Sequence, residues 1–231
     1  MSLTIVREKA TDLIFKVGTD VTNILGITHY ESNIDEQGDR RAELPYGIPK
    51  TDEERHDNLS QVPYGELVDV TLKIDGQSWT AFYNVDTDEF GTLFVKHFSV
   101  PSNILLTGVT SRRCAFSPDV ENSYTAHVKT YDIDNKLKEF CKENGVSLCL
   151  RGETYGQGIQ NLEQNPHCKV PHDLAIFSVY CMNTSRHTYR EDEYYFSNVC
   201  ALLNLPMVPI LESGVPLTED LIKKCVIFVS K

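Results

Sequence analysis

A lysine between two runs of alternating apolar and polar residues constrains the fold more than any other feature of this sequence. Residues 68–72 alternate with the period of a half-buried strand. Asp75-Gly76 follows as a turn signal, because glycine adopts backbone angles that other residues resist. Residues 79–84 alternate again, which predicts that the chain returns as the second strand of a ribbon. Lys73 falls on the polar face, so its side chain should point to solvent or into a cleft.

The spacing around Lys73 leaves two interpretations open. A lysine at the end of a strand often forms an ion pair with a nearby acid, and Asp75 is two residues away. A lysine in a cleft is also a possible nucleophile once its charge is removed, because its free amine titrates near ~10.4. Desolvation, other cations or a divalent metal would make it neutral near pH 7.

A second informative stretch, residues 148–156, reads as a strand in which glycines stand on both sides of Glu153. A helix is predicted just before it, over residues 131–144, because Leu137 and Cys141 share one face and Asn144-Gly145 is a stop signal. We also expect strands at residues 92–98, 105–113 and 173–180, and helices at residues 189–203 and 218–226.

The order Lys-x-Asp-Gly, Ser-Arg, Gly-Glu-x-x-Gly resembles the covalent nucleotidyltransferase superfamily of RNA ligases, DNA ligases and mRNA capping enzymes. Lys73-Ile74-Asp75-Gly76 is similar to its nucleotidyl-lysine motif, and Ser111-Arg112 to its Ser-Arg motif. Residues 152–160 resemble its Gly-Glu motif, with the Gly-x-Gly-Ile-Gln tail of one subgroup of RNA ligases. Residues 20–27 and 48–55 are similar to that subgroup too. The chain therefore resembles ATP-dependent RNA ligases.

This resemblance implies an α+β fold, an ATP-grasp-like ligase domain with mainly antiparallel sheets around a nucleotide cleft. It implies that Lys73 forms a lysyl-AMP intermediate from ATP. The AMP then moves to the 5′-phosphate of an RNA end, and a 3′-hydroxyl displaces it to join the strands. The implied cofactors are ATP and Mg²⁺ or Mn²⁺, and the implied partners are broken or nicked RNA ends, with no membrane and no stable protein partner.

The resemblance also implies roles for four further residues. Asp75 organises the turn or a metal-bound water, and Arg112 contacts the ribose or a phosphate through its planar fork. Glu153 accepts hydrogen bonds from the ribose or holds a metal through water. Phe177 stacks on the adenine. For each there is a structural alternative: Arg112 as a surface arginine, Glu153 as an acid lining a turn, and Phe177 as a core aromatic.

Two motifs of the family, a Glu-Gly-x-Val strand and a Lys-x-Lys strand, have no counterpart here. Residues 212–215 place the glycine wrongly for the first, and Lys223-Lys224 do not form the second. We therefore expect residues 46–231 to form an adenylyltransferase domain that is incomplete at its C-terminus. Residues 1–45 are expected to be an N-terminal extension, the tail of an OB-like module.

Composition narrows the class of protein. A chain of 231 residues that is 41% hydrophobic and 10% aromatic supports a packed core rather than disorder. No apolar run approaches the ~20 residues of a membrane span, and the N-terminus lacks the shape of a signal peptide. Seven scattered cysteines with no Cys-x-x-Cys pair fit a reducing, intracellular setting, which we expect to be the cytoplasm.

The net charge of −11 opposes a general nucleic-acid coat, because phosphate contacts require lysine and arginine. Much of the acid is concentrated in residues 31–57 and 191–193, which we expect to lie away from the cleft. His167, Cys168 and His172 are close in sequence, but Pro166 and Pro171 beside them favour an irregular loop over a metal site.

Two other functions remain open. The first is a DNA ligase or a GTP-using capping enzyme, against which the Gly-x-Gly-Ile-Gln tail argues. The second is a catalytically silent nucleotide- or RNA-binding module. The missing motifs favour this second function, and the presence of Lys73, Arg112 and Glu153 opposes it.

The missing strands generate a first prediction. We expect this chain to form lysyl-AMP slowly or not at all, because losing one electrostatic partner of a transition state costs about 3–4 kcal/mol. Labelled ATP measures the rate. Adduct formation as fast as in a longer chain that carries both strands would contradict the expectation.

Overall fold

The computed structural model describes residues 41–45, 47–50, 62–87, 108–116, 120–160 and 165–228. Backbone contacts divide the chain into residues 1–38 and 39–231, so every described residue belongs to the second unit. The predicted strand at residues 92–98 and most of the predicted N-terminal extension lie outside the described residues. The domain boundary at residue 45 stays a prediction.

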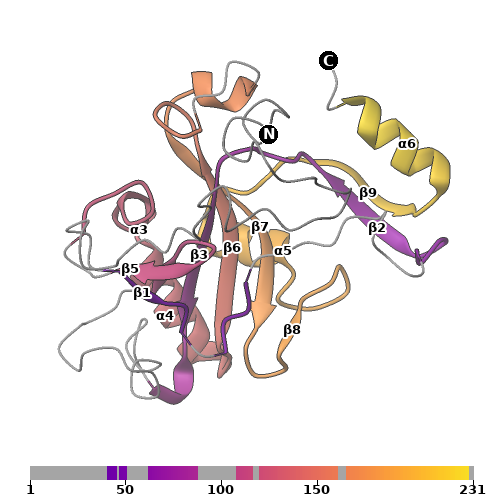
Figure 1. The fold of residues 1–231 in the computed structure, drawn as a ribbon. Helices are drawn as coiled ribbons and strands as arrows, with labels where there is room; N and C mark the ends of the chain where they lie inside the picture. Colours follow the sequence, from indigo (N-terminus) through magenta and orange to yellow (C-terminus); the bar gives the residue numbers. More distant parts are fainter. Residues whose placement is uncertain are drawn as a thin grey trace, which may run out of the picture. The chain divides into compact units, whose positions relative to one another are not determined.

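A seven-stranded sheet dominates the described part of the chain, with the order β1-β5-β4-β3-β6-β7-β8 (Figure 1). Neighbouring strands all run antiparallel. This arrangement confirms the predicted α+β fold with mainly antiparallel sheets. The strands are β1 Arg41–Glu43, β3 Gln77–Tyr83, β4 Val109–Thr110, β5 Cys114–Phe116, β6 Leu148–Tyr155, β7 Asp173–Cys181 and β8 Arg186–His187.

The strand before Lys73 belongs to a different sheet. Strand β2, Leu67–Thr71, pairs with β9, Ile210–Pro216, in a separate antiparallel pair. The two strands predicted on either side of Lys73 are both present. The prediction that they pair with each other in a ribbon is wrong, because β3 pairs with β4 and β6. The chain instead crosses from one sheet to the other at the lysine.

The helices are α3 Ala126–Tyr131, α4 Ile133–Asn144, α5 Phe196–Leu203 and α6 Glu219–Phe228, with short 3₁₀ turns η2 Val85–Thr87 and η4 Pro166–Lys169. The helix predicted at residues 131–144 is α4. It begins at Ile133 because Asp132 has a left-handed φ of 53° and separates α4 from α3. Gly145, at φ 61°, ends α4 as predicted. Of the helix predicted at residues 189–203, only Phe196–Leu203 is helical, as α5. The side chain of Leu202 in α5 is exposed.

No helix within the described ranges has the length and apolar character needed to cross a lipid bilayer.

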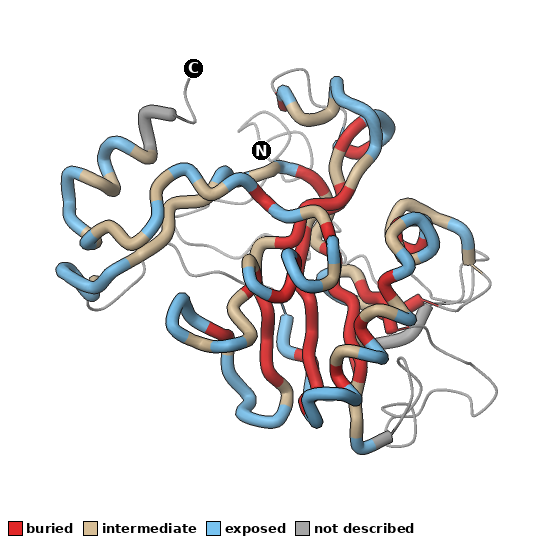
Figure 2. The backbone as a smooth tube through the Cα atoms, turned by 180° about the vertical axis from the view of Figure 1, so that it is seen from behind, coloured by how far each residue is buried: buried red, intermediate tan, exposed pale blue. Residues whose placement is uncertain are grey.

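The main core lies between the central strands and α4, and the strands are the most deeply buried part of the chain (Figure 2). One face of β3 contributes Trp79 and Tyr83. Helix α4 contributes Ile133, Leu137 and Cys141, which recur every four residues on one face. Burial raises the pKa of Cys141 to about 12, so this thiol behaves as a small hydrophobe.

Asp69 anchors the two-stranded sheet to the rest of the described chain. Its carboxylate accepts hydrogen bonds from the Tyr195 hydroxyl at 2.9 Å and from Ser213 and the Gly214 amide at 2.8 Å each. It also forms an ion pair with Arg190, and its side chain is only 4% exposed. Burial alone raises the pKa of Asp69, but the hydrogen bonds together outweigh burial and hold the pKa below 3.8.

This network predicts that Asp69→Asn lowers the free energy of unfolding by about 2–3 kcal/mol at pH 7, because several bonds to a charged acceptor are weakened. The stabilisation is complete above pH 3.8 and is lost as the pH falls through the lower pKa of the folded state. The difference between the two proteins should therefore shrink below about that pH.

Urea unfolding measured from pH 7 downward tests this. Glu121→Gln breaks the exposed ion pair with Lys129 and is the control, expected to change stability little. An Asp69→Asn protein as stable as the control would contradict the anchoring role.

Candidate functional site

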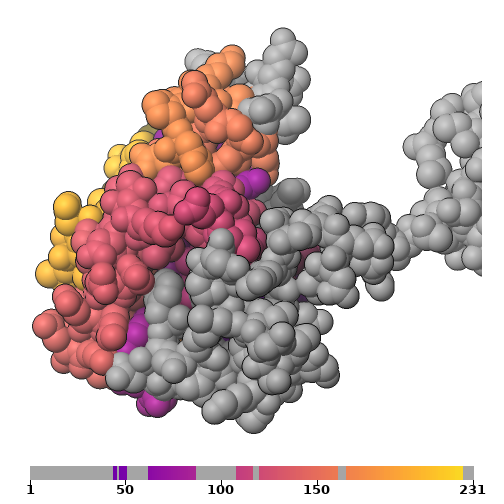
Figure 3. All heavy atoms as spheres, turned by 90° about the vertical axis from the view of Figure 1, so that its left-hand side faces the viewer, coloured from indigo at the N-terminus to yellow at the C-terminus, as the bar shows by residue number. Residues whose placement is uncertain are grey.

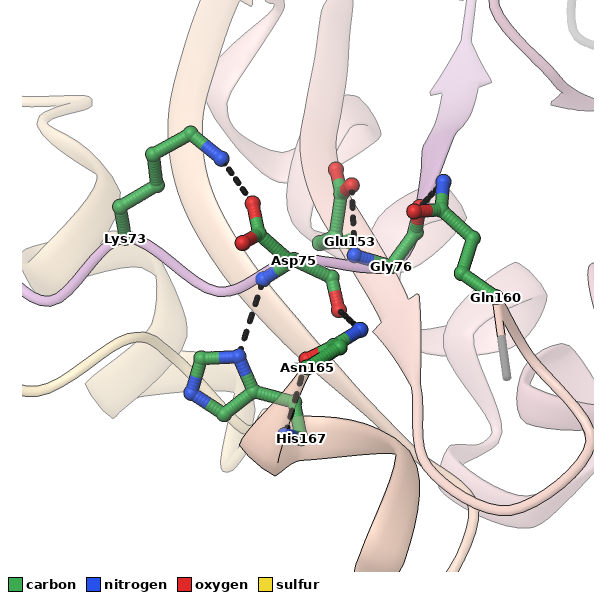
Figure 4. Close-up of polar contacts among 7 residues, drawn as sticks. All are labelled: Lys73, Asp75, Gly76, Glu153, Gln160, Asn165 and His167. Atoms are coloured by element: carbon green, nitrogen blue, oxygen red, sulfur yellow. Dashed lines mark hydrogen bonds and ion pairs between the residues drawn. The ribbon is translucent and has the colours of Figure 1, made fainter. Parts of the chain in front are cut away.

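Lys73 lies on the crossover between the two sheets. The Leu72 amide, just before it, donates to the Pro209 carbonyl at 2.9 Å, beside β9. Strand β3 begins at Gln77, just after the crossover. The Lys73 side chain is 75% exposed, which agrees with the prediction that it points to solvent or into a cleft, although Lys73 lies beyond the end of β2. Its amine forms an ion pair with Asp75, the simpler of the two interpretations that the spacing left open (Figure 4).

The backbone of Asp75-Gly76 is held at all four of its polar groups by side chains from a later part of the chain (Figure 4). At Asp75, the amide donates to His167 Nδ1 at 3.1 Å, and the carbonyl accepts from Asn165 Nδ2 at 3.2 Å. At Gly76, the amide donates to Glu153 Oε1 at 3.1 Å, and the carbonyl accepts from Gln160 Nε2. We call these four side chains the turn clamp.

Position 76 requires glycine because the backbone of β6 is too close for a side chain. A Cβ at this position would lie 2.1 Å from the Thr154 carbonyl oxygen and 3.1 Å from Glu153 Cγ. The sequence indicated a glycine for its turn-forming angles. The structure gives a second reason, since the chain must pass against β6 for Gly76 to meet Glu153.

Glu153 is brought to the lysine turn by strand pairing. It stands opposite Ser78 in the antiparallel pair of β3 and β6, so the two side chains share a face of the sheet. Its carboxylate then reaches back to Gly76, three residues after Lys73. The sequence motifs around Lys73 and Glu153 are therefore adjacent in space.

Arg112 lies in the turn between β4 and β5 rather than in a strand, and it is exposed. Ser111 shapes this turn, because its hydroxyl accepts hydrogen bonds from the amides of Arg113 at 3.2 Å and Cys114 at 3.1 Å. A contact between Arg112 and a nucleotide stays a prediction.

Phe177 lies at an irregularity in the pairing of β6 with β7. Gly152 pairs with Ile176 and Arg151 with Ser178, so Phe177 is the extra residue of a β-bulge. Its half-buried ring packs against the main core. Phe177 therefore has part of the role of a core aromatic, the structural alternative given above. Its stacking on adenine stays a prediction.

A metal site within the loop of His167, Cys168 and His172 finds no support in the described residues, where no group of three His, Cys, Asp or Glu side chains could hold an ion. His167 accepts from Asp75, and His172 Nε2 lies 3.3 Å from His127 Nε2. Burial, followed by the charge of His172, lowers the pKa of His127 to about 4, so His127 is neutral near pH 7.

A pocket of about 300 Å³ lies near the α3 segment, which is drawn in magenta beside the orange residues before β7 (Figure 3). It is separate from the lysine turn. Gln77, which lines it, is on the opposite face of β3 from Ser78 and hence from Glu153. None of the five predicted site residues lines this pocket. Its lining is Gln77, Asn122, Ser123, Ala126, Gln157, Gly158, Ile159 and His172.

Three residues of the turn clamp were missed as functional residues by the sequence reasoning. Gln160 belongs to the Gly-x-Gly-Ile-Gln tail, so a signal was present. Asn165 and His167 carried no comparable signal, because isolated polar residues near prolines are typical of any loop. The site thus places an amine, a carboxylate and a rigid turn together, which suits the attachment of a group to the amine.

Comparison with known proteins identifies related chains. A sequence model of the family described as RNA ligase matches residues 66–227. A Naegleria gruberi RNA ligase variant solved with ATP and Mn is 25% identical, with a TM-score of 0.57, over 92% of this chain and 56% of that one. The same ligase solved with PPi is 24% identical, with a TM-score of 0.55, over 89% of this chain and 54% of that one. The chain thus spans about half the length of these ligases. No curated protein sequence gave a match.

The close approach at position 76 generates a prediction. Gly76→Ala should displace the turn from β6 and lower stability by more than about 1 kcal/mol, because the new Cβ meets backbone atoms that have little room to move. Gly145→Ala is the comparison. It adds a methyl group in open space at φ 61°, so its cost is conformational only, about 1–2 kcal/mol.

Thermal unfolding of both variants, with hydrogen exchange at the Gly76 position, measures the effect. In Gly76→Ala the amide at residue 76 should exchange faster, and in Gly145→Ala it should not. Equal protection in both variants would show that the close approach to β6 does not hold the turn.

Proposed function

The chain belongs to the RNA ligase family, and from this premise we propose that it is an ATP-dependent RNA ligase that forms lysyl-AMP on Lys73. The observation that carries the proposal is the hydrogen bond from the Gly76 amide to Glu153 Oε1 at 3.1 Å. It puts a candidate nucleophile and a candidate ribose acceptor at one turn. The ATP and manganese named for the Naegleria gruberi structures suggest the same ligands for this chain.

In the proposed first step, the Lys73 amine attacks the α-phosphorus of ATP. A nitrogen–phosphorus bond forms, the bond from that phosphorus to the bridging oxygen breaks, and pyrophosphate leaves with the electron pair. The amine is protonated while it is paired with Asp75, so the pair must open and the proton must pass to solvent before attack. Because Lys73 is 75% exposed, a nucleotide reaches its side chain without opening the core.

Other residues would bind the nucleotide. We assign Glu153 to the ribose hydroxyls, Arg112 to the ribose or a phosphate, and Phe177 to the adenine. Asp75 keeps the turn organised, since its carboxylate takes the lysine and its backbone is held by the turn clamp.

Mg²⁺ or Mn²⁺ is the proposed metal. Magnesium is usually held by one or two carboxylates together with water and substrate phosphates. The described residues fit that mode and not a site made of protein ligands alone. As the alternative to its role at the ribose, Glu153 would hold the ion through water. When bound, the ion offsets the negative charge of the triphosphate.

The proposed later steps use RNA ends. An oxygen of the RNA 5′-phosphate attacks the AMP phosphorus, the nitrogen–phosphorus bond breaks, and Lys73 regains a proton. A 3′-hydroxyl then attacks the 5′-phosphate, loses its proton, and releases AMP as the strands join. Family membership supports RNA as the substrate.

Two other functions predict different results. A capping-type enzyme would react with GTP, and a DNA ligase would pass AMP to DNA. A silent module would bind ATP without a covalent adduct. The exposed ion pair of Lys73 with Asp75 is compatible with all of these functions, so the reaction products must separate them.

We predict a mass gain of one AMP on Lys73 after long incubation with ATP and Mg²⁺, and none in Lys73→Ala, which lacks the nucleophile. Peptide mapping locates the adduct. Lys138→Ala removes another exposed lysine, on α4, and should leave the adduct unchanged. ATP, GTP and CTP compared in parallel identify the nucleotide.

The isolated adduct is then mixed with RNA that carries a 5′-phosphate or a 5′-hydroxyl, and with matching DNA. AMP should pass only to the phosphorylated RNA. ATP binding without any adduct, both in this chain and in a longer chain that carries the two missing strands, would overturn the ligase proposal in favour of the silent module. An adduct on another lysine would overturn the role of Lys73.

A further inference from the structure

The turn clamp does more than close a turn. Turns usually satisfy their polar groups locally or with water, but here the partners of Asp75 and Gly76 lie 77 to 92 residues further along the chain. Orienting four side chains around two residues costs conformational entropy. The arrangement therefore fixes this dipeptide far more firmly than a solvent-exposed connection requires.

The backbone is fixed by hydrogen bonds on both sides of Lys73, the proposed nucleophile. On one side, the Leu72 amide is bonded to the Pro209 carbonyl beside β9. On the other side, the turn clamp ties Asp75 and Gly76 to the segment that follows β6. Among the described residues, the Lys73 side chain is bonded to Asp75 alone, two residues away. The backbone position of Lys73 is therefore set by its neighbours on both sides.

The clamping residues are themselves held in place. Asn165 is 6% exposed and uses both ends of its amide, with Oδ1 accepting from the His167 amide at 2.9 Å and Nδ2 donating to Asp75. The His167 ring lies edge-on to Tyr155, with 6.3 Å between ring centroids. Gln160 has φ 41°, a conformation that residues with a side chain rarely adopt.

We propose that Gln160, Asn165 and His167 are positioning residues that fix the backbone of Asp75-Gly76 and thereby aim Lys73 at the α-phosphate of ATP, an inference that rests on the proposed function. In-line attack needs the reacting atoms about 3–3.5 Å apart, and a displacement of about 1 Å is enough to slow a reaction about 100-fold. These three side chains act on the turn and not on the nucleotide. Their loss should slow attachment of AMP more than it weakens ATP binding.

Two pairs of variants separate this role from simple structural support. Asn165→Asp keeps the oxygen that accepts from the His167 amide, but sets a carboxylate oxygen against the Asp75 carbonyl in place of a donor. His167→Asn keeps an acceptor as many bonds from the backbone as Nδ1, whereas His167→Gln moves the acceptor one bond further. Lys169→Ala, an exposed residue of the same 3₁₀ turn, is the matched control.

The first measurement compares the single-turnover rate of lysyl-AMP formation with the dissociation constant of ATP. Asn165→Asp and His167→Gln should slow the covalent step about 10–100-fold, with little change in the dissociation constant. His167→Asn and Lys169→Ala should stay close to the wild type. Equal rates in all variants, or loss of ATP binding in parallel with the rate, would overturn the positioning role.

The second measurement, amide hydrogen exchange at Asp75 and Gly76, does not depend on activity. His167→Gln should speed exchange at Asp75, and His167→Asn and Lys169→Ala should not. If neither the wild-type chain nor a longer chain that carries the two missing strands forms an adduct, the proposed function fails, while faster exchange at Asp75 in His167→Gln would still support the clamp. Unchanged exchange in every variant would overturn the clamp whatever the activity.

Discussion

The contact of the Asp75-Gly76 backbone with β6 and its following loop is the interaction on which the rest of the site depends. Position 76 has no room for a side chain. Because glycine has no Cβ, the Gly76 amide comes close enough to donate a hydrogen bond to Glu153. Without that approach, the lysine motif and the glutamate motif would be two separate surface features. With it, the backbone on both sides of an exposed amine is fixed, although among the described residues its side chain is paired with Asp75 alone.

The same crossover joins two sheets that differ in how they are stabilised. The seven-stranded sheet buries aromatic and aliphatic side chains against α4. The two-stranded sheet exposes Leu67 and Leu211, and two strands alone are marginally stable in water. Its attachment therefore relies on polar links, chiefly the bonds from the buried carboxylate of Asp69 to Arg190 and Tyr195. Lys73 therefore lies between the seven-stranded sheet, which is stabilised by apolar packing, and the two-stranded sheet, which is attached by polar bonds.

Sequence reasoning was most accurate where the signal is local. Alternation located the strands on either side of Lys73, and the Asn144-Gly145 stop marked the end of α4. Pairing between strands is not a local property, and so the partner of β2 was missed: β9 follows it by well over a hundred residues. The bulge at Phe177 was equally hidden, because one extra residue leaves the apolar alternation of a single strand almost unchanged. Asn165 and His167 act through a distant turn, which no spacing rule records.

The ion pair between Lys73 and Asp75 ties the charge of this turn to its chemical state. While the amine is free, the two charges cancel. In the proposed lysyl-AMP state the cation is gone and a phosphoryl group has been added, so Asp75 would lose its counterion and face a second anion. On a chain of net charge −11, the loaded turn becomes a locally repulsive spot. In the proposed reaction, this repulsion would favour transfer of the nucleotide to the RNA over its retention on Lys73.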